Sequence, residues 1–163
     1  MNQETTIDRD QFRGALSRWA SGVTVVTAAG SLGPVGLTAS AFSSLSLDPP
    51  LVLVCVGKDG ASHDPVTAAE GFAVHLLSDA QEGLSSRFAR AGEGKFSDLS
   101  WEVGPFGVPL LGGSLARLVC ERDGVHDGGD HTILVGRVVE AEISGGRPLL
   151  YWMGGYRGLA PKS

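Results

Sequence analysis

The sequence predicts a mainly β protein with short helices, in which six or seven antiparallel strands form a closed or nearly closed barrel. Short segments rich in β-branched or apolar residues outnumber segments with helical periodicity. The 24 glycines are spread along the 163 residues, which implies many tight turns. No Gly-x-Gly-x-x-Gly motif follows a strand, so a parallel dinucleotide-binding sheet is not expected.

The first predicted element is an amphipathic helix over residues 8–21. Phe12, Leu16 and Trp19 recur with helical spacing. Asp8 is a good N-cap residue, with a glutamine three residues later. We expect the apolar face of this helix to lie on a sheet.

The next segments read as strands and short helices in alternation. Residues 23–27 and 35–39 form a hairpin around a Gly-Ser-Leu-Gly-Pro turn, and residues 51–56, apolar on both faces, form a central strand. Ser78 and Gln81 have the spacing of a capping box. We therefore expect a strand at 72–77, with helices at 62–70 and 78–90 on either side of it.

The second half of the chain is richer in turns. Residues 92–114 hold many glycines without a sustained period, which predicts a long structured surface loop. Strands are expected at 115–121 and 132–143, on either side of a connection at 122–130. A last strand is expected at 149–152.

Composition limits the class of protein. The length predicts one domain over residues 1–163, and 42% hydrophobic residues are enough for a core. A net charge of -5 disfavours nucleic-acid binding as the main function. No apolar run is long enough to span a bilayer, and the first residues lack the layout of a secretory signal, so we expect a cytoplasmic protein. Cys55 and Cys120 are expected to be buried free thiols.

The most unusual segment is residues 38–46, with five hydroxyl side chains in nine positions. Hydroxyls and free backbone amides in a turn suit a phosphate or a ring with many acceptors. A serine-rich loop that hydrogen-bonds only to itself is the alternative, and composition alone favours it.

Several spaced motifs together resemble the flavin reductase family, whose fold is the FMN-binding split barrel. The resemblance covers nearly the whole chain in the right order. The motifs lie at residues 22–27, 37–52, 88–89, 95–96, 129–131 and 156–157. One departure is visible, because Ala41 stands where the family often has a second serine.

The resemblance implies a homodimeric, six-stranded antiparallel Greek-key split β-barrel. Such a protein binds FMN or FAD, takes hydride from NADH or NADPH, and commonly passes reduced flavin to a partner monooxygenase. Which flavin, which nicotinamide and which oxygenase are used stays open.

The resemblance also assigns flavin contacts. It places Thr38, Ala39 and Ser40 along the isoalloxazine, and Ser43, Ser44 and Ser46 near the ribityl phosphate. It makes Cys55, Val56, Lys58 and Ser62 the opposite wall of the pocket, although Lys58 is equally well explained as a solvated loop charge. Phe88 and Lys95 are implied near the flavin tail, where a core position is the alternative for Phe88. Arg90 and Lys95 are the better phosphate ligands, because two cations on a loop can follow a dianion.

The segment from His126 to His131 carries two imidazoles and two carboxylates, which suggests a metal site. Its glycines fit a turn better, and the resemblance places residues 129–131 on the nicotinamide side of the pocket. We therefore predict no metal and assign the catalytic position to His131, with Asp130 fixing its tautomer. Tyr156 and Arg157 are implied as further nicotinamide nucleotide contacts.

Two other functions remain alternatives to the reductase. One is a flavin- or heme-binding carrier or storage protein on the same barrel, without nucleotide turnover. The other is an oxidase with a prosthetic flavin. Hydride transfer between two cofactors needs no nucleophile or strong base from the protein, so the lack of a catalytic triad fits a reductase.

Overall fold

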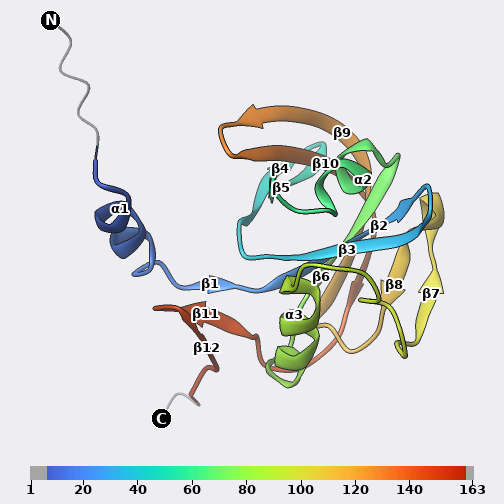
Figure 1. The fold of residues 1–163 in the computed structure, drawn as a ribbon. Helices are drawn as coiled ribbons and strands as arrows, with labels where there is room; N and C mark the ends of the chain where they lie inside the picture. Colours follow the sequence, from blue (N-terminus) through green and yellow to red (C-terminus); the bar gives the residue numbers. More distant parts are fainter. Residues whose placement is uncertain (1–6, 161–163) are drawn as a thin grey trace, which may run out of the picture.

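The computed structural model describes residues 7–160, and its largest element is a seven-stranded antiparallel sheet with the strand order β3-β2-β6-β9-β10-β5-β4 (Figure 1). The prediction of a mainly β, antiparallel fold with short helices is confirmed. The strands of this sheet are β2 (Thr24–Gly30), β3 (Gly33–Ala39), β4 (Phe42–Leu47), β5 (Pro50–Gly57), β6 (Gly71–Leu76), β9 (Ala116–Gly128) and β10 (His131–Ile143).

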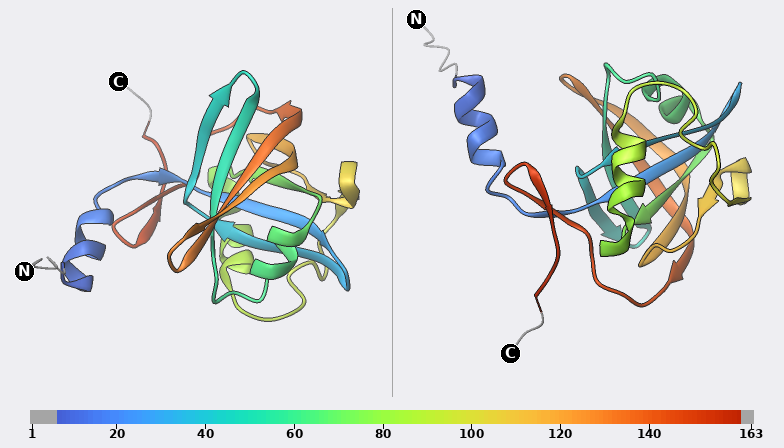
Figure 2. Two further views of the ribbon diagram at one scale, coloured as in Figure 1. Left: turned by 90° about the horizontal axis from the view of Figure 1, so that it is seen from above. Right: turned by 60° about the horizontal axis from the view of Figure 1, so that its bottom comes forward.

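The sheet curls around one apolar core. Val26 on β2 and Val54 on β5 belong to the same buried cluster, although three strands lie between β2 and β5 in the sheet. In addition, β3 at one edge of the sheet contacts β5, which lies next to the other edge, so the two ends of the sheet turn toward each other, as the views in Figure 2 show. The edge strands β3 and β4 follow one another in the chain, joined by Ser40 and Ala41, yet no hydrogen-bonded ladder joins them within the described residues. The sheet thus has seven strands and an open seam, which is within the six or seven strands predicted from the sequence pattern, whereas the six-stranded barrel implied by the resemblance is not confirmed.

The β9–β10 hairpin is longer than predicted. We expected a connection at 122–130, but β9 continues to Gly128 and pairs with β10 across a two-residue turn at Gly129 and Asp130. Gly129 has a φ of 79°, a left-handed conformation that suits glycine in such a turn. In the exposed outer half of β9, Val125 is the only large apolar residue, so the sequence lacks the alternation of a strand.

Two helices cover parts of the sheet. The expected helix at 62–70 is α2 (His63–Ala68), with Val66 buried. The expected helix at 78–90 is divided into a short 3-10 helix, η1 (Asp79–Gln81), and α3 (Glu82–Ala89). The capping box between Ser78 and Gln81 is confirmed. Phe88 of α3 is buried against Gly36 of β3, where an added Cβ would lie 2.7 Å from its ring.

The segment at 92–114 is more regular than the loop we expected. It contains β7 (Trp101–Val103) and β8 (Pro109–Leu111), which pair with each other, and a 3-10 turn, η2 (Pro105–Gly107). Phe106 of η2 covers Gly71 of β6, which has no Cβ to collide with the ring. Three-residue strands bounded by proline and glycine leave too short a pattern to recognise in a sequence.

The predicted position of the first helix was wrong. Helix α1 (Arg9–Leu16) is shorter than residues 8–21, buries none of its residues and lies apart from the main sheet (Figures 1 and 2). It leads into β1 (Ser21–Gly22), which pairs with β11 (Leu150–Trp152), and β11 pairs with β12 (Gly155–Arg157). We call α1, β1, β11 and β12 the terminal arm. The predicted cap is confirmed, because the Asp8 carboxylate accepts from the Gln11 amide.

Candidate functional site

The hydroxyl-rich segment lies along the end of β3 and on β4, so most of it is strand and not the turn we expected. The Thr38 hydroxyl donates to the Ser85 carbonyl oxygen over 2.6 Å, and the Ser43 hydroxyl donates to the Ser44 carbonyl over 2.9 Å. Ala39 is buried, whereas Ser40 is exposed. Part of the segment thus bonds to the protein itself, while Ser40, Ser43 and Ser44 are exposed.

A cavity of about 570 Å³ lies between this segment and the terminal arm. Ser40 and Ser43 line it from the sheet, and the half-buried Cys55 lines it from β5. Ser44 and Ser46 are not among its lining residues. On the arm, the walls are formed by Arg13, Leu16, Ser17, Trp19, Ser21, Tyr151, Trp152 and Met153. Sequence reasoning missed these arm residues as cavity walls, because only the folded arm brings the two ends of the chain together.

Neighbouring residues of β5 point to opposite sides of the sheet. Cys55 faces the cavity, and the Val56 side chain lies in the core with 1% exposure. A ligand in the cavity can therefore reach Val56 only through its backbone. Cys55 lines the cavity, as a residue of the pocket wall would. Its side chain is half-buried, where we had predicted a buried thiol.

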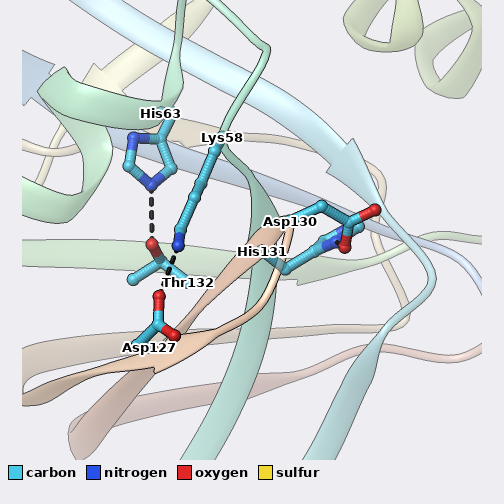
Figure 3. Close-up of polar contacts among 6 residues, drawn as sticks. All are labelled: Lys58, His63, Asp127, Asp130, His131 and Thr132. Atoms are coloured by element: carbon cyan, nitrogen blue, oxygen red, sulfur yellow. Dashed lines mark hydrogen bonds and ion pairs between the residues drawn. The ribbon is translucent and has the colours of Figure 1, made fainter. Parts of the chain in front are cut away.

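Lys58 follows β5 and forms an ion pair with Asp127 on β9 (Figure 3). The hydrogen bond from Lys58 holds the pKa of the Asp127 carboxyl below its usual range. Since both side chains are well exposed, the pair contributes little to stability, yet it ties the β9–β10 hairpin to the connection after β5. The Lys58 ammonium is thus already paired with a carboxylate within the protein.

Two predicted phosphate ligands meet at Gly36 of β3. The Ser62 hydroxyl donates to the Gly36 carbonyl over 2.9 Å, and the Lys95 ammonium donates to the same oxygen over 3.1 Å and to the Phe88 carbonyl over 3.2 Å. Burial lowers the pKa of Lys95. Both side chains line a second cavity of about 560 Å³ between the β2–β3 turn and the loop at 92–97.

The other two predicted residues near this cavity differ from Lys95. The Phe88 ring is buried, 1% exposed, with its edge against Phe96 at a centroid distance of 5.0 Å. This is the core position that we considered as the alternative for Phe88. Arg90 directly follows α3 and is exposed.

His131 is the first residue of β10 and lies opposite Gly57 of β5. Its Nδ1 atom is 2.7 Å from the Asp130 carboxylate (Figure 3). A carboxylate can only accept, so this contact places a proton on Nδ1 and leaves Nε2 as the acceptor in the neutral ring. The same hydrogen bond lowers the pKa of the Asp130 carboxyl. The predicted pairing of the two residues is thus present, with His131 about half exposed.

The remaining two predicted nicotinamide contacts lie elsewhere. The Tyr156 hydroxyl is 2.8 Å from the Ser85 hydroxyl, which links β12 to α3. The Arg157 guanidinium donates to the Tyr156 carbonyl oxygen over 2.7 Å. Tyr156 and His131 are therefore held by different elements, one on the terminal arm and one at the tip of the β9–β10 hairpin.

Comparison with known proteins identifies the class. Residues 16–160 match the family model of the flavin reductase like domain. The chain belongs to the flavin reductase family. Within residues 7–160, no helix is both long and apolar enough to cross a membrane, and no three His, Cys, Asp or Glu side chains gather into a potential metal site.

Individual relatives resemble nearly the whole chain. It is 48% identical to the FMN reductase (NADH) SmoA of Agrobacterium fabrum, over 89% of this chain and 83% of that protein. It is 40% identical to HsaB of Rhodococcus jostii, the reductase subunit of a flavin-dependent monooxygenase, over 95% and 80%. A solved structure of the Streptomyces globisporus NADH:FAD oxidoreductase SgcE6, in complex with NAD and FAD fragments, superimposes with a TM-score of 0.90 at 41% identity, covering 96% of this chain and 95% of that one.

Proposed function

We propose that this protein is an NAD(P)H:flavin oxidoreductase that transfers hydride from a reduced nicotinamide to FMN or FAD. The observation that carries the proposal is the family membership over residues 16–160, together with relatives named as NADH-dependent FMN or FAD reductases. We further propose that the curled sheet with its open seam is the split barrel of this family.

The two cavities have a suitable size and chemistry to bind a flavin. The first cavity is walled largely by apolar and aromatic side chains, with a few polar groups, as is typical of cofactor sites. The polar groups come from Ser40 and Ser43 on the sheet and from Arg13, Ser17 and Ser21 on the arm. The second cavity holds Ser62 and Lys95, a hydroxyl and a cation of the kind that bind phosphate. Gly36 borders the second cavity and Ser40 the first, and the four steps along the chain between them span about 13 Å. This spacing suits a ring just past the end of β3 and a phosphate beside the middle of the strand.

The bound flavin would supply the electron-accepting ring, and the protein's part is to position the two reactants. In this proposal, backbone groups along residues 38–40 and 55–57 hold the ring edge, and Lys95 with Ser62 holds the phosphate. His131 contacts the nicotinamide through Nε2, while Asp130 keeps the imidazole in one tautomer. The roles of Thr38, Ser43, Ser44, Ser46, Arg90, Tyr156 and Arg157 as further ligand contacts stay predictions.

We also propose that the protein is a homodimer. The terminal arm stands apart from the main sheet, and Phe12, Leu16 and Trp19 are exposed by 49%, 56% and 78%. An amphipathic helix that buries none of its own residues leaves its apolar face free to gain stability from a partner surface. A second copy supplies such a surface, and it would cover the first cavity from the arm side.

The proposed partner of the reaction is a flavin-dependent monooxygenase that consumes the reduced flavin. This part of the proposal rests on the name of the HsaB relative. The competing function is a flavin- or heme-binding carrier without nucleotide turnover.

Oxidation of NADH or NADPH under air, with catalytic FMN or FAD, separates the two functions. We expect the absorbance of the reduced nicotinamide to disappear only when both protein and flavin are present. Running the four combinations of nicotinamide and flavin also determines the cofactor preference. Tight flavin binding without any nicotinamide consumption would favour the carrier and reject the reductase.

A further inference from the structure

We propose that His63 is a positioning residue for His131. Through Thr132 it holds the start of β10, so that the His131 imidazole keeps its place opposite Gly57. The inference rests on the proposed function, because only a nicotinamide substrate gives the position of His131 a catalytic consequence.

The contact between His63 and Thr132 is well made. The His63 Nε2 atom lies 2.8 Å from the Thr132 hydroxyl (Figure 3). The Nδ1 atom of the same ring lies 2.6 Å from the Asp64 carboxylate. The carboxylate can only accept, so Nδ1 carries the proton and, in the neutral ring, Nε2 accepts the Thr132 hydroxyl hydrogen. The His63 side chain is 15% exposed, and Thr132 is buried. A shielded hydrogen bond of this kind fixes both side chains.

The position of Thr132 makes this bond relevant to His131. Neighbouring residues of a strand point to opposite faces, so fixing the side chain of Thr132 also fixes the direction in which His131 leaves the strand. An added Cβ on Gly57 would lie 3.7 Å from His131 Nε2, so a small rotation of the strand end would close or widen this approach.

The same short connection anchors the other side of His131. The Lys58 amide donates to the Asp130 carbonyl over 3.0 Å, and the Lys58 ammonium pairs with Asp127. Residues 58–63, from the end of β5 to the start of α2, therefore contact the hairpin tip at Asp127, Asp130 and Thr132. Because Ser62, a proposed phosphate ligand, precedes His63 in this connection, the flavin end and the nicotinamide end of the site share one anchoring segment.

A purely structural tie between α2 and β10 is the competing explanation, and substitutions of Thr132 distinguish the two. Thr132→Val removes the hydroxyl at nearly constant shape, and Thr132→Ser restores it. His63→Gln keeps an acceptor for the hydroxyl but loses the imidazole. His126→Gln is the matched control, an exposed histidine on the same hairpin.

We expect Thr132→Val to raise the KM for NADH about fivefold, the loss typical of one hydrogen bond, while the flavin Kd changes less than about twofold. Thr132→Ser, His63→Gln and His126→Gln should stay near the wild-type KM. When His131 is already replaced by alanine, Thr132→Val should add no further increase, since the path runs through His131. Independent, additive effects in this double-mutant cycle would overturn the proposal.

A second measurement does not depend on activity. The ring resonances of His131, observed by NMR in the flavin-free protein, should shift in Thr132→Val and stay unchanged in His126→Gln. Unchanged His131 resonances in Thr132→Val would refute the positioning role. A wild-type protein that oxidises no NADH would instead refute the proposed function, with the NMR result still deciding whether the hydrogen bond between His63 and Thr132 controls the geometry of His131. Should Thr132→Val fail to fold, His63→Phe, which also removes the acceptor, takes its place in both measurements.

Discussion

The Nε2 atom of the buried His75 imidazole accepts a hydrogen bond from the Leu111 amide over 3.0 Å. On the other side of the ring, Nδ1 lies 3.1 Å from the Val25 carbonyl oxygen, to which it donates. The neutral imidazole thus connects β2, β6 and β8 in the interior. A protonated ring would have no acceptor for Leu111, and its charge would be buried without a counter-ion.

Stability should therefore fall with acidification in a way that depends on His75. Burial lowers the pKa of His75 from 6.5 to about 4. Between these pH values, the imidazole is therefore protonated in the unfolded chain and neutral in the folded protein. The contribution is complete above pH 6.5 and is lost progressively as the pH falls to 4. At about 1.4 kcal/mol per pKa unit, it amounts to roughly 3 kcal/mol. The free energy of unfolding can be measured with urea between these pH values for the wild type, His75→Gln and His126→Gln. It should depend less steeply on pH in His75→Gln than in the other two proteins.

Replacement of His131 by alanine should chiefly affect the nicotinamide. A lost hydrogen bond to the carboxamide should raise the KM for NADH roughly tenfold, while the Kd of flavin, measured by fluorescence quenching, should change little. Loss of flavin binding with normal turnover of the flavin that remains bound would move His131 to the flavin side of the site.

Lys95 should contribute more to FMN affinity than Arg90 does. Lys95 lies in the second cavity beside Ser62, whereas Arg90 is exposed at the end of α3. Lys95→Met should weaken FMN binding about tenfold and riboflavin binding little, because only FMN carries the phosphate. Arg90→Met is the matched cation control. Equal losses for FMN and riboflavin in Lys95→Met would place this ammonium away from the phosphate.

Gly136 should tolerate no side chain. An added Cβ would lie 2.4 Å from the Phe72 ring and 2.7 Å from Cys120, both fully buried in the core. Gly136→Ala should destabilise the protein by about 1–3 kcal/mol through overpacking. Gly83→Ala, in α3 with nothing within 4 Å of the added atom, should stabilise by roughly 0.5–1 kcal/mol. Denaturant midpoints of the two variants should thus move in opposite directions.

The terminal arm should determine the oligomeric state. Leu16→Glu places a charge on the exposed apolar face of α1, which a second copy is proposed to cover. Size-exclusion chromatography with light scattering should give a dimer for the wild type and a monomer, or a concentration-dependent mixture, for Leu16→Glu. The control Leu32→Glu, on the fully exposed β2–β3 turn, should remain a dimer. A wild type that is monomeric at all concentrations would contradict the dimer.

The elements that could be predicted from the sequence were those with long, continuous runs of apolar residues. The buried strands β5 and β6 were predicted nearly to the residue, because their apolar runs are continuous and bounded by turn residues. The outer half of β9 was missed, since polar residues on both faces carry no period. Helix α1 was recognised as amphipathic, but the pattern of a helix does not say which surface covers it. Its placement on a sheet was therefore wrong.

The site was predictable only in part, for a related reason. The spaced motifs led to the family and to the residues along β3, β5 and the loop at 92–97. They did not reveal that Val56 turns its side chain into the core, or that Lys58 pairs with Asp127, whereas the core position of Phe88 had been recognised as an alternative. That pair and the bond between His63 and Thr132 each join residues 69 positions apart, on elements that become neighbours only after folding.

In the proposed role of Lys95 as a phosphate ligand, its two carbonyl acceptors affect how tightly the nucleotide is held. An ammonium that already has good acceptors gives them up when an anion arrives, so the gain on binding is the difference between two sets of bonds and not a full new set. Such an exchange lowers the affinity for the anion, although Lys95 can still bind it. It also favours release, because the ammonium regains its hydrogen bonds to the Gly36 and Phe88 carbonyl oxygens when the anion leaves.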